Sequence, residues 1–349
     1  MRTVLKNPMF LIGMLILLLL FGGSVYYTVV YDDEIPQTFM LYNEDGNLID
    51  KAPLTPKQVQ PFGTDKLGYH LFHQIIIGAK YTIGIAILIA CMRLSLSFVA
   101  GVISGTFTKK TSRVTSGLVD AMQYIPISLL SYFILRGVLM ENGMEGTFQY
   151  NFWERAIFEV IILTAVAVPT TTVLISNETN SLWQKSYIEG ARILGGSRMS
   201  ILFRHILPHL WPRLTIIFLQ QLNNVFILLL HLGLLKLFFG GTLFSPDPTL
   251  GDEYRSVSSE WSGLIGSTYE FLPYNTWIPL IPILFFVLVI FSVNIALEGY
   301  KQTLDRQAVI KRRRKEKACV TDVRKVSASS FYFIKQEDQK FEERKAVNR

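Results

Sequence analysis

A polar stretch from Tyr187 to Pro212 separates two long apolar runs and contains most of the side chains that could bind another macromolecule. It carries Glu189, Arg192, Arg198, Arg204, His205 and His209. Its apolar residues follow a helical period over 187–194 and 198–207, so we predict two short helices, a turn at Gly195–Gly196 and a stop at Pro208. Hydrocarbon does not tolerate this density of charge, so the stretch must lie outside a bilayer, where a soluble partner can reach it.

The first predicted helix of this stretch has the features of a docking surface. Glu189 and Arg192 are three residues apart and can offer a charged pair to a partner. Ala191, together with the glycines, keeps one face small enough for a close approach. Gly195 allows the sharp turn that directs the short helix away from the membrane.

Outside the 187–212 stretch, the sequence gives little indication of a nucleotide-binding site or a metal site. No G-x-x-x-x-G-K-[S/T] segment is present, so the loop that cradles ATP phosphates is missing and energy must come from a separate subunit. His70 and His73 have a spacing that could bind a metal ion. No third ligand stands near them in the sequence, so we favour a polar interface helix and predict no resident metal or cofactor.

Three polar residues inside apolar runs are candidates for a transport path. Arg93 stands near the middle of one run, where an arginine is costly in lipid. It either lines a path and meets a carboxylate, or pairs with Glu159 or an acid of another subunit. Asn223 and His231 lie in a later run, where a pore-facing position and hydrogen bonding between helices are equally good explanations.

The elements that must position these residues are membrane helices. Only 17% of the residues are charged against about 25% in soluble domains, half are hydrophobic, and the mean hydropathy is +0.33. The first apolar run continues past the small residues Gly22–Gly23–Ser24, so we predict a retained helix and not a cleaved signal peptide. We predict six transmembrane helices, at residues 9–30, 75–107, 114–135, 156–176, 214–239 and 277–297.

The positions of the basic residues predict the topology. Of the 34 Lys and Arg residues, 25 lie in the N-terminus, the gap at 108–113, the 177–213 loop and the tail, whereas the other loops are acidic. Short cytoplasmic loops carry this excess of positive charge. We therefore predict that both termini and the 187–212 loop lie in the cytoplasm of a prokaryote, with the chain in its plasma membrane.

The chain divides into four parts. Residues 1–30 form the N-terminal segment and first helix, and residues 31–74 form a small extracytoplasmic lobe with a hairpin near 39–49. Residues 75–306 form a core of five helices. Residues 307–349 are a basic tail, which we predict to be disordered and to contact anionic lipid through Lys311–Lys315. No fold competent for nucleic acid remains.

The polar stretch resembles the cytoplasmic "EAA" loop of ABC-importer permeases. The matching residues are Glu189-Gly190-Ala191, Gly195 and Arg204-His205-Ile206-Leu207-Pro208. This residue pattern most resembles that of the C-type permease subunit in the dipeptide, oligopeptide and nickel subclass. Further similar stretches are Pro61 to Gly68, Gly78 to Thr82, Asp120 with Pro126, and Glu298 to Asp305.

The resemblance implies an all-α type I ABC-importer fold, a six-helix membrane protein with a cytoplasmic coupling helix, and no ATPase site of its own. It implies docking of an ATPase subunit through Glu189, Gly190, Ala191, Arg192, Gly195, His205 and Pro208. The expected partners are a second permease in a heterodimer, two ATP-binding subunits and an extracytoplasmic substrate-binding protein. Peptides are the expected substrate, and a nickel or metallophore importer is the alternative; a channel or a membrane enzyme is the remoter one.

The chain also departs from the subclass. Gly190 replaces the first alanine of the EAA triplet, and Tyr69-His70 stand where Arg-Asp is usual. Arg93 occupies an otherwise apolar span, and the fifth span has leucines and His231 in place of a glutamate and a run of small residues. These differences bear on the substrate more than on the fold.

Overall fold

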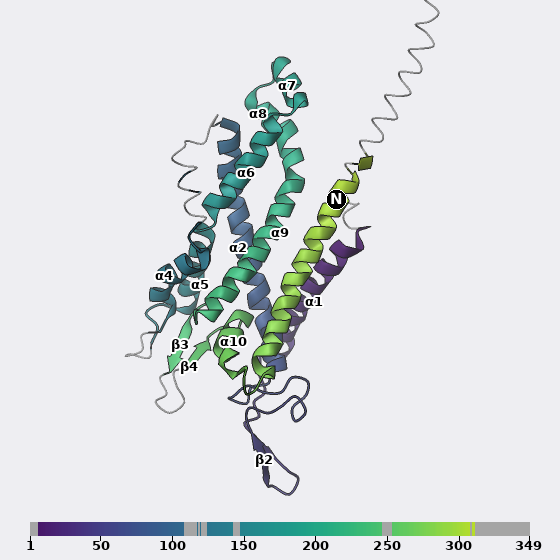
Figure 1. Ribbon diagram of the computed structural model, residues 1–349. Helices are drawn as coiled ribbons and strands as arrows, with labels where there is room; N and C mark the ends of the chain where they lie inside the picture. Colours follow the sequence, from purple (N-terminus) through teal and green to yellow (C-terminus); the bar gives the residue numbers. More distant parts are fainter. Residues whose placement is uncertain are drawn as a thin grey trace, which may run out of the picture.

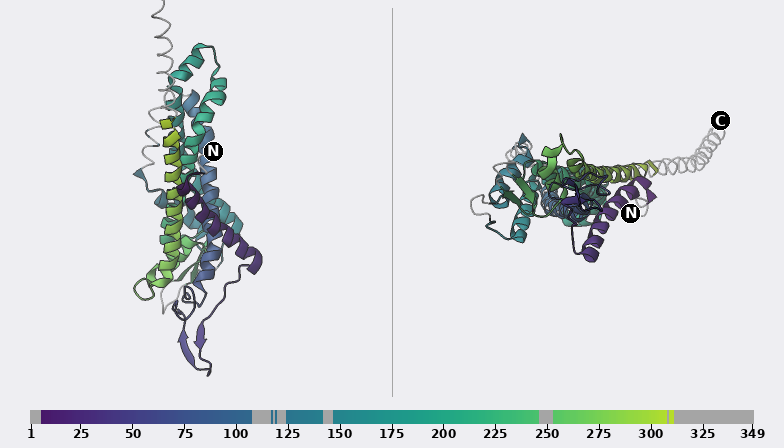
Figure 2. Two further views of the ribbon diagram at one scale, coloured as in Figure 1. Left: turned by 90° about the vertical axis from the view of Figure 1, so that its right-hand side faces the viewer. Right: turned by 90° about the horizontal axis from the view of Figure 1, so that it is seen from below.

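Long helices running side by side form the body of the molecule (Figure 1). The structure is a computed structural model that describes residues 6–107, 117, 119, 124–141, 147–245, 253–307, 309 and 310. The long helices are α1 (Pro8–Tyr31), α2 (Leu71–Phe107), α9 (Leu207–Leu234) and a last helix (Trp277–Gln307), drawn in yellow-green. Figure 2 shows the same bundle from the side and from one end.

The two ends of the bundle differ in structure. One, here called the loop end, carries α7 (Ser186–Ile193) and α8 (Arg198–Ile201). The other, the lobe end, carries the hairpin β1 (Met40–Tyr42) and β2 (Leu48–Lys51), as predicted from the sequence near 39–49.

A second hairpin and a short helix also lie at the lobe end. The strands β3 (Thr242–Ser245) and β4 (Glu253–Ser256) pair antiparallel, and α10 (Trp261–Thr268) is followed by the one-turn η3 (Tyr269–Phe271). The fully buried Trp261 fixes α10 against α2 by donating its indole N–H to the carbonyl of Ile75 at 2.8 Å. The described residues are mostly helical, as predicted, and two short antiparallel hairpins add β-structure at the lobe end.

The described residues contain four helices long and apolar enough to span a membrane, or five if one bent pair counts as a single span. The bent pair is α5 (Phe152–Ala165) and α6 (Val168–Trp183), which meet at 42° near Pro169, inside the span predicted at 156–176. The shorter α4 (Ile127–Leu139) begins after Pro126, at the end of the predicted third span. The first part of that span, including Asp120 but not residues 117 and 119, and the tail from residue 311 lie outside the described residues.

The buried apolar side chains form two separate cores. The larger joins α2, α5, α9, α10 and the last helix toward the lobe end. The smaller joins the end of α2, α6, the α7–α8 segment and the start of α9, through residues such as Ile175, Ile188 and Ile206. Because α2 and α9 contribute to both cores, they are the elements that connect the loop end with the lobe end.

The first helix packs on the last one. Asn7 caps α1 and donates its side-chain amide to the carbonyl of Gly299 at 2.8 Å. The backbones approach closely where Gly13 lies against Ser292 and Ala296, since a Cβ at Gly13 would overlap both. Small residues at such crossings are typical of helix pairs in membranes.

Candidate functional site

The short helix α7 ends in a glycine cap that directs the chain sideways. The N–H of Gly196 donates to the carbonyl of Ala191 at 3.1 Å, and the N–H of Gly195 donates to that of Arg192 at 3.0 Å. Gly195 has a φ of +85°, the left-handed conformation that favours glycine at this position. The predicted helix, its limits and the Gly195–Gly196 turn are thus confirmed.

One apolar face fixes α7 to the bundle and leaves the rest of the helix accessible. Ile188 is fully buried in the smaller core and Ala191 packs partly against it. Glu189, Gly190 and Arg192 are exposed. Glu189 has no ion-pair partner among the described residues, and the guanidinium of Arg192 lies over the Trp183 ring at 5.8 Å. The charged residues of α7 therefore point to solvent and do not neutralise each other.

The second half of the site differs from the prediction at Pro208. The helix continues without a stop from Arg198 through Pro208 and Pro212 to Leu234. Pro208 is tolerated because it occupies the first turn of α9 and a π-helical turn (η2, Leu202–Ile206) immediately precedes it, where the N–H of Leu207 reaches the carbonyl of Leu202. α8 is therefore a continuous extension of a spanning helix, and α7 is joined to it through the Gly195–Gly196 turn.

Sequence reasoning missed two apolar side chains at the tip of this segment. Ile193 and Leu194 are 82% and 89% exposed, beside the glycine turn. It also missed that Tyr187 and His209 lie ring to ring at 5.5 Å, which joins α7 to α9. The signal for the first pair was available: an Ile-Leu pair next to a turn that aims away from the bundle has no core to join.

The path candidates on α9 lie on or near an open face of the helix. His231 is exposed, in line with the exposed residues Gln220, Asn224, Ile227 and Leu234 at helical spacing. Asn223 is half-buried and donates its amide to Oδ1 of Asn294 on the last helix at 3.2 Å. The two alternatives for Asn223 and His231 thus separate: Asn223 makes a contact between helices, and His231 faces outward from the single chain.

Arg93 lies inside the chain, 2% exposed. Its Nε and Nη2 donate to the carbonyl of Leu163 at 3.0 and 2.5 Å. Glu159, the acid named as its partner, instead accepts from the N–H of Gly240 at 3.1 Å. The path role of Arg93 stays a prediction, and its burial favours the alternative of a contact within the protein, with a backbone carbonyl in place of an acid.

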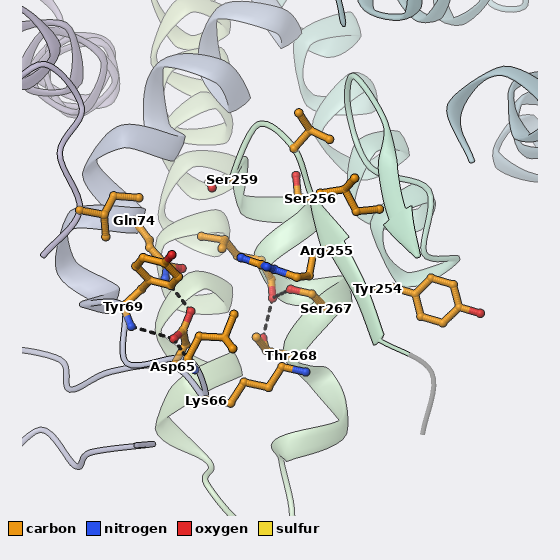
Figure 3. A pocket seen from close by; sticks show the side chains of 15 residues that line it. Asp65, Lys66, Tyr69, Gln74, Tyr254, Arg255, Ser256, Ser259, Ser267 and Thr268 are labelled. Carbon is orange, nitrogen blue, oxygen red and sulfur yellow. Dashed lines mark hydrogen bonds between the residues drawn. The ribbon is translucent and has the colours of Figure 1, made fainter. Parts of the chain in front are cut away.

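A cavity of about 390 Å³ opens at the lobe end between the segment before α2, strand β4 and α10 (Figure 3). Asp65 shapes one wall by accepting from the N–H groups of Leu67 and Tyr69, both at 2.9 Å, and from Gln74 at 2.7 Å. Burial raises the pKa of Asp65, against the lowering effect of these bonds and of the Arg255 charge. Arg255 stands on the wall opposite Asp65 and is exposed.

The two histidines near this cavity do not assemble a metal site. Nε2 of His70 lies 3.0 Å from Oγ1 of Thr38, and the rings of His70 and His73 are 5.6 Å apart. No group of three or more His, Cys, Asp or Glu side chains with metal-binding geometry occurs within the described part of the chain. His70 instead ties the start of α2 to the lobe.

Comparison with known proteins now identifies the class. The profile of the family described as binding-protein-dependent transport system inner membrane component matches residues 97–307, more than half of the chain. The chain belongs to this family. It is a multi-pass permease of the inner membrane, in a binding-protein-dependent ABC importer whose ATPase resides on separate subunits.

Individual relatives of this permease are distant. The oligopeptide transport system permease protein OppC of Bacillus subtilis is 21% identical over 86% of each chain. The glutathione transport system permease protein GsiD of Pectobacterium atrosepticum is 22% identical over 73% of this chain and 75% of its own. Among solved structures, an inward-facing MetNI methionine ABC transporter is 15% identical, with a TM-score of 0.46 over 65% of this chain and 94% of the other. The predicted family is thus confirmed by the profile.

Proposed function

We propose that the α7–α8 segment is the coupling element of the permease, docking into a groove of an ATP-binding subunit. The observation that carries this proposal is the tip itself: Ile193 and Leu194 are almost fully exposed next to the unpaired Glu189. Exposed apolar residues rimmed by charge mark protein interaction sites. Gly190, Ala191, Arg192 and Gly195 complete this surface, and His205 of η2 and Pro208 at the start of α9 lie at its base.

The complete importer then contains a second permease, two ATP-binding subunits and an extracytoplasmic substrate-binding protein. In this arrangement the loop end and both termini face the cytoplasm, the lobe end faces the binding protein, and six helices cross the membrane. The basic tail contacts anionic lipid. No cofactor resides in this chain, and ATP is used by the partner subunits.

We propose peptides as the substrate class. The relatives named for oligopeptide and glutathione transport support it. His231 and the exposed face of α9 face the second permease across the path, with Asn223 at its edge. A nickel or metallophore importer is the second candidate, because the His70–His73 pair lies near the cavity at the lobe end. Uptake of a labelled peptide mixture against radioactive nickel by cells expressing the complete system separates the two.

The docking role is tested by co-purification of the ATP-binding subunit with tagged permease. We expect Glu189→Ala and Leu194→Ala each to reduce the recovered ATPase and the uptake. Leu48→Ala is the matched control, because Leu48 is also an exposed leucine but lies in the lobe hairpin. If Glu189→Ala and Leu194→Ala both leave docking and transport intact, the proposal is wrong.

A further inference from the structure

The break between α5 and α6 leaves backbone carbonyls without their helical partners. In a continuous helix the N–H of Ala167 would donate to the carbonyl of Leu163, but here it donates to Thr164 at 3.2 Å. Pro169 has no N–H and therefore offers nothing to the carbonyl of Ala165. An unsatisfied carbonyl at membrane depth costs several kcal/mol, so the break requires donors from outside the bent pair.

Two side chains of α2 supply donors on either side of the break. Arg93 donates twice to the carbonyl of Leu163, near the end of α5. Ser97, four residues later and therefore on the same face of α2, donates to the carbonyl of Val168, at the start of α6, at 3.2 Å. One turn of α2 thus binds both halves of the broken span.

The two halves belong to different cores. From Ser97 toward the loop end, Gly101 and Gly105 continue the same face of α2. These glycines let α6 pack closely against α2, since a Cβ at Gly101 would lie 2.8 Å from Cβ of Ile175. That contact is part of the smaller core, which also holds α7. Beyond the break, α5 joins the larger core through Val160 and Leu163. Arg93 therefore sits at the junction between the loop end and the lobe end.

Burying the charged side chain of Arg93 at this junction costs free energy, and close packing of the helices alone would not require a charge there. Arg93 has no acidic partner within the part of the chain that the structure describes, and its Nε and Nη2 both donate to the one carbonyl of Leu163. Its guanidinium is a planar fork that holds this carbonyl in one direction, which a methyl-bearing side chain cannot do.

We propose that Arg93 is a positioning residue of the transport cycle: it fixes the angle at which α5 meets α6, so that movement of the α7–α8 segment is passed on to the lobe end. The inference rests on the docking role proposed above. Arg93 acts here through the Leu163 carbonyl and does not contact the transported substrate.

The test measures the angle directly. The full complex, with Cys91→Ser and Cys319→Ser, receives spin labels at Ile157→Cys on α5 and Leu174→Cys on α6, both of which are exposed positions. Pulsed electron paramagnetic resonance then compares the nucleotide-free complex with the complex trapped by ATP and vanadate. Arg136→Met, which removes an exposed arginine on α4, is the control for Arg93→Met.

With Arg93 present we expect one narrow distance distribution that shifts on trapping. Arg93→Met retains the ATPase subunits and basal hydrolysis, but its distribution broadens and the shift is lost, whereas Arg136→Met behaves as the parent. If Arg93→Met does not assemble, Arg93→Lys, which keeps the charge but loses the fork, is expected to assemble with a broadened distribution.

The inference is overturned if the distance distribution of Arg93→Met is the same as that of the parent. If only Arg93→Lys assembles, the same result in that variant overturns it. So does labelling of Arg93→Cys by a charged, water-soluble thiol reagent with protection by a peptide mixture, which assigns the residue to the path. A parent complex that hydrolyses ATP yet shows no shift overturns both this inference and the proposed coupling, so the two failures are distinguishable.

Discussion

Asn223 on α9 and Asn294 on the last helix are joined by a side-chain hydrogen bond of 3.2 Å. Both helices expose a face to the surroundings of the single chain next to this contact. The bond therefore fixes the spacing of the two helices that border the proposed path. Hydrogen bonds between helices in membranes contribute about 0.6 kcal/mol on average.

We expect a double-mutant cycle of Asn223→Leu and Asn294→Leu to give a coupling energy of about 0.6 to 1.7 kcal/mol. The measurement is the free energy of unfolding of the purified permease in mixed detergent micelles. Additive effects of the two substitutions would mean that the bond does not stabilise the helix pair.

The close packing of α2 and α6 predicts opposite effects for two glycine substitutions. Gly101→Ala is destabilising because the new Cβ would meet Ile175 and the carbonyl of Thr172 at less than 3 Å. At Gly137 on α4 a new Cβ would meet no other atom within 4 Å. Gly137→Ala is therefore expected to stabilise its helix by up to about 1 kcal/mol. Thermal unfolding in detergent measures both, and equal shifts in the melting temperature contradict the packing argument.

The glycine cap of α7 gives a second matched pair. Gly195→Ala places a Cβ at a φ of +85° and is expected to cost about 1 to 2 kcal/mol of local stability. Gly190→Ala restores the alanine that is usual at this position of the EAA loop and has open space for its Cβ, so we expect binding to be retained. Recovery of the ATP-binding subunit with each tagged variant is the readout; a Gly195→Ala permease that recovers as much as Gly190→Ala shows that the cap does not orient the docking surface.

The contact between His70 and Thr38 predicts that the lobe loosens in acid. Burial lowers the pKa of His70, so the folded lobe prefers the neutral ring. The stabilisation is complete above the unfolded pKa of about 6.5 and is lost as the pH falls through the lower folded value. Hydrogen exchange of residues 31–70, corrected for intrinsic rates, should therefore increase between about pH 7 and about pH 5. His70→Gln is expected to reduce this dependence, and an unchanged pH response in that variant would point to another group.

The α7–α8 segment and most spans were predictable because their sequence signals are local. Apolar length, a glycine pair and a cluster of charges at Glu189 to His209 mark helices, a turn and an aqueous loop without any tertiary information. The family followed from the same residues, and the profile match confirms it.

Other features depend on contacts far apart in the sequence and were missed. Pro208 does not end its helix because a π turn and the smaller core accommodate it. The contacts of the 42° break near Pro169 were also missed, because Arg93 and Ser97, about 70 residues earlier, donate to carbonyls on either side of it. Strands β3 and β4 lack the signal that identified the first hairpin, which was a short turn at residues 43–46 between two apolar runs.

The bond between Asn7 and Gly299 has a consequence for how the protein is made. The two residues are 292 positions apart, so the first helix enters the membrane long before its partner exists. At about 5 to 20 residues per second, roughly 15 to 60 s of synthesis separate them. Until the last helix is made, the face of α1 around Gly13 lacks the Ser292 and Ala296 surface on which it packs in the finished chain. The contact between the first and the last helix can therefore form only at the end of synthesis.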